Sequence, residues 1–256
     1  MLRKIKESSF LFSELVKRDF KKKYKSTYLG MLWSLLSPLL SLLVMTVVFG
    51  KFFGRETEHY TIYVFCGNIL FSYFSDTTSG GMGALVANSA IFSKIRVPKY
   101  LFVLSRTTAS LINLGLTFIV FFLFLLLDGV RLTAALFGIV IPVMLIAIFS
   151  IGLALSLSAL FVFFRDMQYL WSVFTMLLMY LSAIFYTVGP ESFGGAARLF
   201  YLNPVYLYIS FLRSLVLGGR FPSPSVCMLG VAYAALSLAV GAAIYRKCNQ
   251  RFIYYV

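Results

Sequence analysis

The sequence predicts an all-helical membrane protein whose chain crosses a lipid bilayer six times. Of its 256 residues, 60% are hydrophobic and only 12% are charged, whereas soluble domains average about 45–50% apolar and about 25% charged residues. The mean hydropathy of +0.89 agrees with that imbalance. These values exclude a soluble enzyme, a disordered tail and a small disulfide-linked scaffold.

Six apolar stretches reach the length of about 20 residues that a transmembrane helix needs. They cover residues 29–49, 60–83, 100–127, 134–163, 167–186 and 225–244. The third and fourth stretches are longer than a bilayer requires, so we expect them to tilt or to extend beyond it. Polar segments or segments with Gly and Pro separate the stretches, which favours six distinct spans.

The distribution of Lys and Arg predicts that both chain termini lie in the cytoplasm. In that orientation, sixteen of the 23 basic residues fall on the cytoplasmic side, six fall on the other side, and Arg106 lies inside the third span. Cytoplasmic loops of membrane proteins carry such an excess of basic residues. The net charge of +14 therefore reflects topology, and we expect no nucleic-acid partner.

Residues 1–28 predict an amphipathic helix ahead of the first span. Large apolar residues recur every four positions from Phe12 to Tyr28, and Arg18 and several lysines occupy the other sides. Such a helix lies in the membrane interface, where anionic lipids attract its cations. Whether it only anchors the chain or also contacts a cytoplasmic partner stays open. The remaining residues, 29–256, would form one six-helix domain.

The cytoplasmic segment between the second and third spans predicts a short helix. Asn88 or Ser89 can cap its start, Pro98 can end it, and Ile91 and Phe92 give it an apolar edge. An apolar edge outside the bilayer favours a docking surface for a partner. The alternative is a connector that folds against the ends of the spans.

The segment after the fifth span predicts a re-entrant helical hairpin on the outer side, over about residues 189–222. Two apolar runs flank Asn203 and Pro204, and the segment is too polar as a whole to face lipid. Re-entrant backbone is tolerated where protein or a water-filled cavity covers it. An amphipathic hairpin lying on the membrane surface is the alternative.

Two charged residues fall inside the predicted spans, Asp76 in the second and Arg106 in the third. A charge near the centre of an inserted helix costs about 2.5–3.5 kcal/mol. We therefore expect the two side chains to face each other or an aqueous path, either as a structural pair or as a substrate contact.

The sequence has no set of residues for covalent chemistry. It has no phosphate-binding loop, no paired carboxylates and a single histidine, His59, and its three cysteines are scattered without metal-ligand spacing. We expect no catalytic residue, metal or cofactor on this chain, and therefore no enzyme.

Four motifs resemble those of ABC-2 type transport permeases, specifically the polysaccharide exporters. Residues 24–39 (YKSTYLGMLWSLLSPL) resemble the start of the first span in that family. The other three are VPK at 97–99, FRD at 164–166 and NP at 203–204. All four occur in the family's order and spacing over nearly the whole chain.

The resemblance implies a homodimer of six-span subunits in the bacterial cytoplasmic (inner) membrane, paired with two copies of a separate ABC nucleotide-binding subunit. That partner would bind ATP and Mg and hydrolyse the ATP. The substrate class it implies is a lipid-linked glycan, such as the O antigen of lipopolysaccharide, a capsule or a teichoic acid, moved outward. Export of a small amphiphile or drug by the same fold is the alternative.

The resemblance also implies roles for particular segments. The N-terminal helix would be the interface helix and the short cytoplasmic helix the coupling helix, seated in a cleft of the ATPase. The residues expected to contact the ATPase are Asn88, Ile91, Phe92, Lys94, Arg96, Arg165 and Asp166.

Sugar rings present apolar C–H faces that stack on aromatic side chains, so we expect an aromatic-lined path between two subunits. The candidate residues are Trp33, Tyr63, Phe71, Tyr73, Phe74, Phe185 and Tyr186. For each ring, packing in the core or in the aromatic belt of the membrane interface is the alternative. The phosphate of a polyprenyl carrier would contact Lys21, Lys22, Lys23 and Lys25, because lysine suits phosphate as a point charge.

Overall fold

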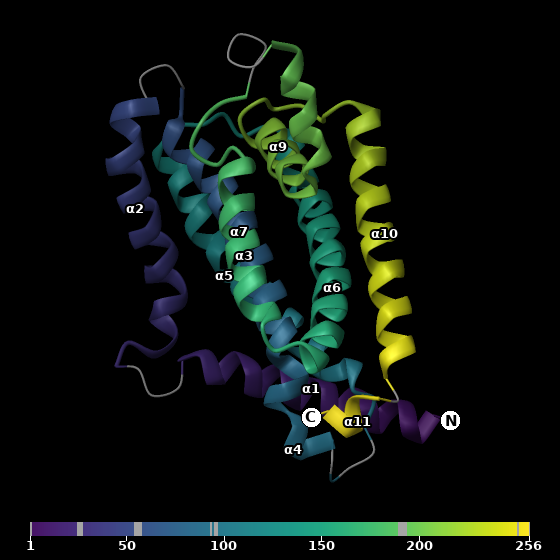
Figure 1. The fold of residues 1–256 in the computed structure, drawn as a ribbon. Coiled ribbons are helices and arrows are strands. Elements are labelled where there is room, and N and C mark those ends of the chain that lie inside the picture. The colour runs from purple at the N-terminus through teal and green to yellow at the C-terminus, as the bar shows by residue number, and fades with distance from the viewer. Residues whose placement is uncertain are drawn as a thin grey trace.

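The computed structural model is helical throughout the part of the chain that it describes, with a bundle of long helices and shorter helices at both ends (Figure 1). The described residues are 2–24, 28–53, 58–92, 94, 97–188, 194–249 and 251–255. The long helices are α1 (Leu2–Tyr24), α2 (Trp33–Phe53), α3 (Tyr60–Ala87), α5 (Tyr100–Leu127), α6 (Val140–Phe163), α7 (Met167–Leu181), α9 (Pro204–Val216) and α10 (Pro224–Cys248). The short ones are η1 (Gly30–Leu32), α4 (Ser89–Phe92), η2 (Ala134–Ile139), η3 (Gly194–Leu202) and α11 (Phe252–Tyr255).

Helix α3 is the central element of the bundle. It packs against α5 and α6, and α2, α7 and α9 also contact it. Its side chains Phe65, Leu70 and Phe74 are fully buried in the main hydrophobic core. Since α3 contacts helices on all sides, its polar residues are placed to line spaces between helices.

The two ends of the bundle differ. Helix α1 lies across one end, and α4, α11 and both chain termini lie at that end as well (Figure 1); we refer to it as the α1 end. Leu15 of α1 is buried in a second hydrophobic cluster with Leu101 and Phe102 of α5. Helix α9 lies at the opposite end, the α9 end, where it contacts η2, η3, α3 and α6.

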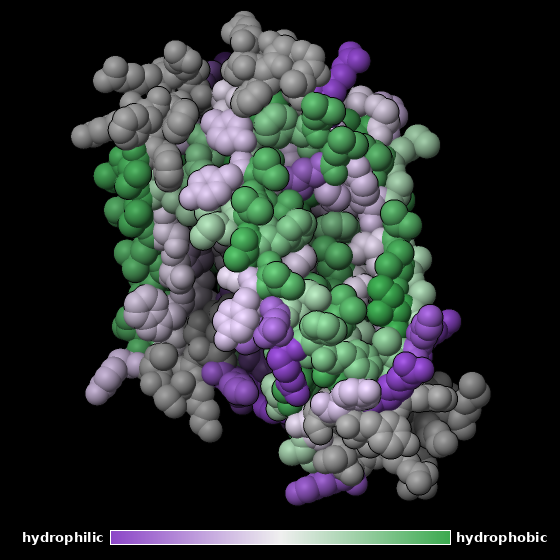
Figure 2. Space-filling model, in the orientation of Figure 1, coloured by the Kyte–Doolittle hydropathy of each residue, from purple (hydrophilic) through white to green (hydrophobic). Residues whose placement is uncertain are grey.

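Three helices in the described part of the chain are long and apolar enough to cross a membrane: Tyr100–Leu127, Ala134–Phe163 and Pro224–Cys248. The apolar helices Trp33–Val48, Met167–Leu181 and Pro204–Val216 are shorter. Hydrophobic residues cover most of one face of the bundle, with hydrophilic residues mostly near its ends (Figure 2). The chain thus has the helices of a membrane protein, and the six-span topology stays a prediction.

The helix boundaries differ from the predicted spans at several points. The first span begins only at Trp33, after a turn in which Gly30 has a φ of +49°. The fifth ends at Leu181 because Ala183 adopts a φ of +48°, which a continuing helix does not allow. Helix α1 is described as far as Tyr24, and Lys25 lies outside the described residues.

The outer segment contains a helix on either side of Asn203, η3 and α9. The Asn203 side chain accepts a hydrogen bond from Val205 N at 3.0 Å, and Pro204 stands at the first helical position. This is the preferred chemistry of a helix start. The re-entry of this hairpin into a membrane stays a prediction.

Helices α6 and α10 cross at very short range. A side-chain carbon on Gly241 would overlap the carbonyl oxygen of Gly152, and one on Gly152 would overlap the backbone of Ser237. Ser237 Oγ also donates to Phe149 O at 2.8 Å. Small residues allow such close approach between helices in a membrane, so this crossing depends on both glycines.

Candidate functional site

A polar cavity of about 430 Å³ lies between α2, α3 and α5. Its lining residues are Trp33, Ser34, Ser37, Pro38, Ser41, Asn68, Ile69, Ser72, Tyr73, Asp76, Ser110, Asn113, Leu114 and Thr117. Most of these side chains carry hydroxyl or amide groups, which both donate and accept hydrogen bonds. The cavity is therefore an uncharged polar space, apart from Asp76, inside an apolar bundle.

Helical spacing brings these polar side chains together. On α3, Asn68, Ser72 and Asp76 recur every four residues, and α2 and α5 carry similar stripes of hydroxyl and amide residues at spacings of three and four. Residues at such spacings share one face of a helix. Three polar faces thus converge on one space.

A larger groove, of about 1320 Å³, lies between α1, α3, α4 and α5; we refer to it as the basic groove. Its lining residues are Arg18, Asp19, Lys21, Lys22, Gly30, Ser79, Gly80, Gly83, Ala84, Ala87, Asn88, Ile91 and Arg106. The α3 wall consists of small residues, which leave the space open. The groove has four basic side chains and one carboxylate among its lining residues.

An ion pair lies between the polar cavity and the basic groove. Asp76 lines the cavity and Arg106 lines the groove, and Arg106 Nη2 is 3.2 Å from Asp76 Oδ1. Ser110 Oγ also donates to Asp76 Oδ2 at 2.8 Å. Each side chain of the pair is partly exposed, by 25% for Arg106 and 30% for Asp76, so both remain accessible.

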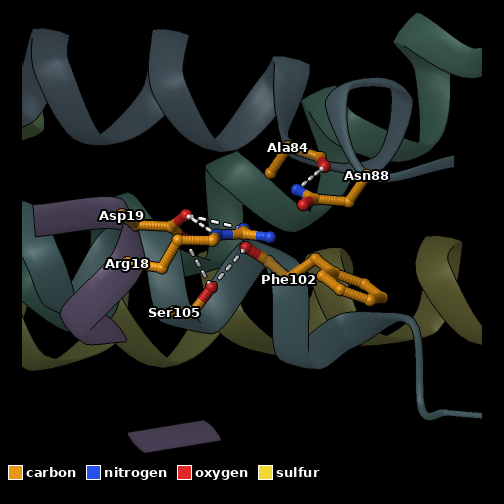
Figure 3. Close-up of polar contacts among 6 residues, drawn as sticks. All are labelled: Arg18, Asp19, Ala84, Asn88, Phe102 and Ser105. Carbon is orange, nitrogen blue, oxygen red and sulfur yellow. Dashed lines mark hydrogen bonds and ion pairs between the residues drawn. The ribbon is translucent and has the colours of Figure 1, made fainter. Parts of the chain in front are cut away.

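A buried carboxylate joins α1 to α5. Asp19 accepts a hydrogen bond from Ser105 Oγ of α5 at 2.8 Å and from Arg18 Nη2 at 2.7 Å (Figure 3). Asp19 stands four residues after the buried Leu15 and so falls on the same face of α1, which was the available sequence signal for this contact. The contact holds one wall of the basic groove in place.

The residues predicted to contact the ATPase lie in two segments, one around α4 and one between α6 and α7. Asn88 is buried, and its amide donates back to Ala84 O at 2.7 Å instead of capping α4 (Figure 3). Ile91 is half-buried against the second core cluster, and Lys94 is exposed. The FRD residues Arg165 and Asp166 are exposed between α6 and α7. The side chains of Phe92 and Arg96 lie outside the described residues, as do those of Lys23 and Lys25.

The predicted aromatic residues fall into three groups. Trp33 and Tyr73 line the polar cavity, although the Tyr73 side chain is also buried in the main core. Phe71 and Phe74 are buried in the main core, where the Phe74 ring lies 6.1 Å from that of Phe149. Tyr63, Phe185 and Tyr186 do not line that cavity, and they meet at a separate cluster of hydrogen bonds. The structure therefore places two of the seven rings at the polar cavity.

In that cluster, the side chains of Arg213, Tyr60 and Tyr63 donate hydrogen bonds to four successive carbonyl groups, those of residues 183–186. We call these donors and carbonyl groups together the carbonyl clamp. Arg213 donates to Ala183 O at 2.9 Å and to Ile184 O at 3.0 Å, Tyr60 Oη donates to Phe185 O at 2.9 Å, and Tyr63 Oη donates to Tyr186 O at 2.7 Å. Non-helical backbone in apolar surroundings needs such partners. The clamp thus pairs the carbonyl groups of residues 183–186 at the point where the chain leaves the α7 helix after Leu181.

Sequence reasoning missed the central residue of the clamp. Arg213 is buried on α9, in an apolar run that ends at Val216. A lone arginine in such a run was the available signal, because a buried charge requires partners. Gly67 of α3 leaves room for it, since a side-chain carbon there would lie 3.0 Å from Arg213 Nη2.

Comparison with known proteins gives a consistent result. The chain is 28% identical over 197 residues to the O-antigen export system permease protein RfbA of Klebsiella pneumoniae, covering 76% of this chain and 74% of that protein. It is 24% identical over 199 residues to the protein of the same name from Myxococcus xanthus, covering 76% and 75%. The sequence pattern of the ABC-2 type transporter family matches residues 11–217. That match covers most of α1 and the helices from α2 to α9, and the chain therefore belongs to the ABC-2 type transporter family.

Proposed function

We propose that this chain is the transmembrane subunit of an ATP-driven exporter that moves lipid-linked polysaccharide across the bacterial cytoplasmic membrane. The family is one of transporters, and relatives in two organisms are named as O-antigen export permeases. The substrate would be a polyprenyl-linked glycan of the O-antigen, capsule or teichoic acid type.

The polar cavity is the observation that carries this proposal. Hydroxyl and amide groups exchange hydrogen bonds with sugar hydroxyls, and the partly exposed ring of Trp33 at the cavity offers a stacking face. The adjoining basic groove supplies lysines and arginines, which bind phosphate. A polar space with Asp76 as its one charged lining residue, beside a cationic groove, matches a substrate that joins sugars to a phosphate.

In this proposal six helices cross the membrane: α2, α3, α5, α6 with η2, α7 and α10. Both termini and the α1 end face the cytoplasm, and η3 with α9 forms a hairpin that re-enters the membrane from outside. Residues 1–28 form the interface helix, and residues 29–256 form the transmembrane domain. Two copies of the chain form a homodimer, with the glycan path between them.

Energy would come from a separate subunit that binds ATP and Mg, present in two copies. The coupling surface is α4 with its flanking residues and the turn that holds Arg165 and Asp166. ATP binding would close the partner dimer and move this surface as a rigid body. That movement would be passed to α3, which continues into α4 through the hydrogen bonds of Asn88.

Deleting the gene in its host and measuring surface glycan tests the substrate class. We expect loss of one surface glycan, with its lipid-linked form accumulating inside the cell. Unchanged surface glycans together with increased sensitivity to amphiphilic drugs would contradict the proposal and support export of a small amphiphile.

The coupling surface is tested by placing charges on α4. We expect Ile91→Asp with Phe92→Asp to abolish co-purification with the ATPase subunit and stimulation of its activity, while membrane insertion stays intact. Tyr255→Asp is the matched control, because Tyr255 is an exposed aromatic residue of α11 at the same end. Co-purification that survives the α4 change would overturn the coupling assignment.

A further inference from the structure

We propose that Arg106 changes partner during binding, from Asp76 to a phosphate group held in the basic groove, and that this exchange opens the polar cavity to the attached sugar. The ligand class is a phosphate or diphosphate ester. The inference rests on the proposed function in one respect, which is that the transported molecule joins such a phosphate to a glycan.

The basic groove has the charge of an anion site. Lys21 and Lys22 are exposed on α1, and within the described part of the chain the ion pairs of the groove residues are Arg18 with Asp19 and Arg106 with Asp76. Asp19 is neutralised by Arg18 beside it and is bound by Ser105. Among the described residues, no carboxylate forms an ion pair with Lys21 or Lys22, and a phosphate in the groove would balance their charge.

Arg106 is placed to join this site. Its bond to Asp76 uses one terminal nitrogen and is 3.2 Å long, which exceeds the 2.7–2.9 Å typical of charge-assisted pairs. A guanidinium has five N–H donors, and the Arg106 side chain already lines the groove. A phosphate beside Lys21 and Lys22 would compete with Asp76 for the same donors, and a bidentate arginine–phosphate contact is stronger than this single bond.

Release of Arg106 changes the polar cavity. Asp76 lines the cavity and stays held by Ser110 Oγ at 2.8 Å. Without Arg106, its carboxylate becomes an acceptor for the hydroxyl groups of a ligand in the cavity. Phosphate in the groove and the first sugar in the cavity would thus be recognised together, with Arg106 and Asp76 between them.

Gly80 of α3 identifies a selective way to disturb Arg106. A side-chain carbon on Gly80 would lie 2.5 Å from Arg106 Nε, whereas one on Gly115 of α5 meets nothing within 4 Å. Gly80 lines the groove and Gly115 does not, and both gain helix propensity when changed to alanine. Gly80→Ala therefore displaces the flexible end of Arg106, and Gly115→Ala is its control.

The fluorescence of Trp33 can report on the exchange. The chain has two tryptophans, so Trp171→Phe leaves Trp33 at the polar cavity as the one tryptophan of this chain. We would titrate inorganic pyrophosphate into this variant, reconstituted with its ATPase partner in phosphatidylcholine nanodiscs, and subtract the signal of the same complex that also carries Trp33→Phe, which removes any contribution from the partner. The expected result is a saturable change in Trp33 emission, lost in Lys21→Ala with Lys22→Ala and retained in Lys17→Ala, whose exposed side chain pairs with Glu14.

Three further variants test the exchange itself. Asp76→Asn removes the competitor, so pyrophosphate should bind more tightly, by up to about fivefold, as expected for loss of a pair worth up to about 1 kcal/mol. Arg106→Gln and Gly80→Ala should weaken binding, and Gly115→Ala should not. Equal affinity in Asp76→Asn and the parent, or equal weakening by both glycine variants, would overturn the proposal.

Two lipid additions identify the source of the phosphate. Undecaprenyl phosphate in the nanodisc should compete with pyrophosphate, whereas phosphatidylglycerol at the same fraction should not. Equal competition by phosphatidylglycerol would overturn the selectivity for a carrier phosphate. Glycan export without any response of Trp33 would refute this inference alone, and a normal response in a protein that exports no glycan would refute the proposed function alone.

Discussion

The guanidinium carbon of Arg213 lies 3.4 Å from the centre of the Tyr63 ring. Arg213 Nε also donates to Tyr63 O at 3.2 Å, so α9 is bonded to both the side chain and the backbone of the same α3 residue. With the ring face covered by Arg213 and the hydroxyl donated to Tyr186 O, Tyr63 is occupied by the carbonyl clamp. A stacking role for Tyr63 in the glycan path would require this clamp to open.

Replacing Arg213 should destabilise the protein strongly. Arg213→Met leaves the carbonyls of Ala183 and Ile184 without their donor, and each unpaired buried group costs about 1–3 kcal/mol. Arg213→Lys should recover only part of the loss, because an ammonium cannot donate in the planar fork of a guanidinium. The measurement is the thermal unfolding midpoint in detergent. Arg220→Met, at an exposed arginine, is the control, and equal midpoints for the Arg213→Met and Arg220→Met proteins would contradict the clamp.

The crossing of α6 and α10 should be intolerant of one methyl group. In Gly241→Ala the new carbon would overlap Gly152 O, and backbone cannot move aside as a side-chain end can. Overpacking of this kind costs about 1–3 kcal/mol or more. Gly115→Ala, which meets nothing within 4 Å, should be neutral or slightly stabilising. The measurement is the thermal unfolding midpoint of each variant. A Gly241→Ala protein as stable as the Gly115→Ala protein would contradict the close approach of the α6 and α10 backbones.

The Asp19 contact should control how firmly α1 is held. Asp19→Ala removes the acceptor of Ser105 and Arg18, and hydrogen bonds to charged groups contribute about 1.5–3 kcal/mol. We expect faster tryptic cleavage at Lys21 and Lys22 and weaker stimulation of the ATPase partner. Glu14→Ala should behave like the parent, because Glu14 is exposed and its pair with Lys17 lies on the surface. Unchanged cleavage in Asp19→Ala would show that apolar packing alone holds α1.

Two aromatic residues should give opposite results when changed to alanine. Trp33 lines the polar cavity and is 38% exposed, so Trp33→Ala should reduce glycan export at unchanged stability. Phe74 is fully buried, and Phe74→Ala should cost about 3–5 kcal/mol of stability. Export per folded molecule and the unfolding midpoint separate the two effects. A Trp33→Ala protein with normal export would argue against a substrate role for that ring.

Much of the fold could be predicted because membrane helices are encoded by continuous apolar stretches. The predicted third span, 100–127, coincides with α5, and the fourth ends with α6 at Phe163. The end of α7 could not be predicted in this way. Residues 182–186 are apolar enough to continue a helix, and they depart from it because Arg213, Tyr60 and Tyr63, which are distant in sequence, bind their carbonyls.

The site was predictable to a smaller extent. Aromatic composition indicated candidate rings but could not separate those that line a cavity, such as Trp33, from those that fill the core, such as Phe74. Individual serines and asparagines did not indicate the cavity, because a single hydroxyl or amide group is common in a membrane span. Only the packing of three helices shows that Ser37, Ser72 and Asn113 line the same space. The sequence signal for these cavity residues is the recurrence of polar side chains every three or four positions within each span.

The contact between Gly152 and Gly241 also bears on how this molecule could move. Helices α6 and α10 should move together as a rigid unit. Their backbones are so close at Gly152 and Gly241 that rotation or sliding of one helix would bring its carbonyl groups into collision with the other. Helix α3 packs along α6 and so is braced by the same unit. A movement passed from α4 to α3 would then carry α3, α6 and α10 together as one rigid unit, and the width of the polar cavity would be set by how far this unit moves from α2, which holds Trp33 and Ser37.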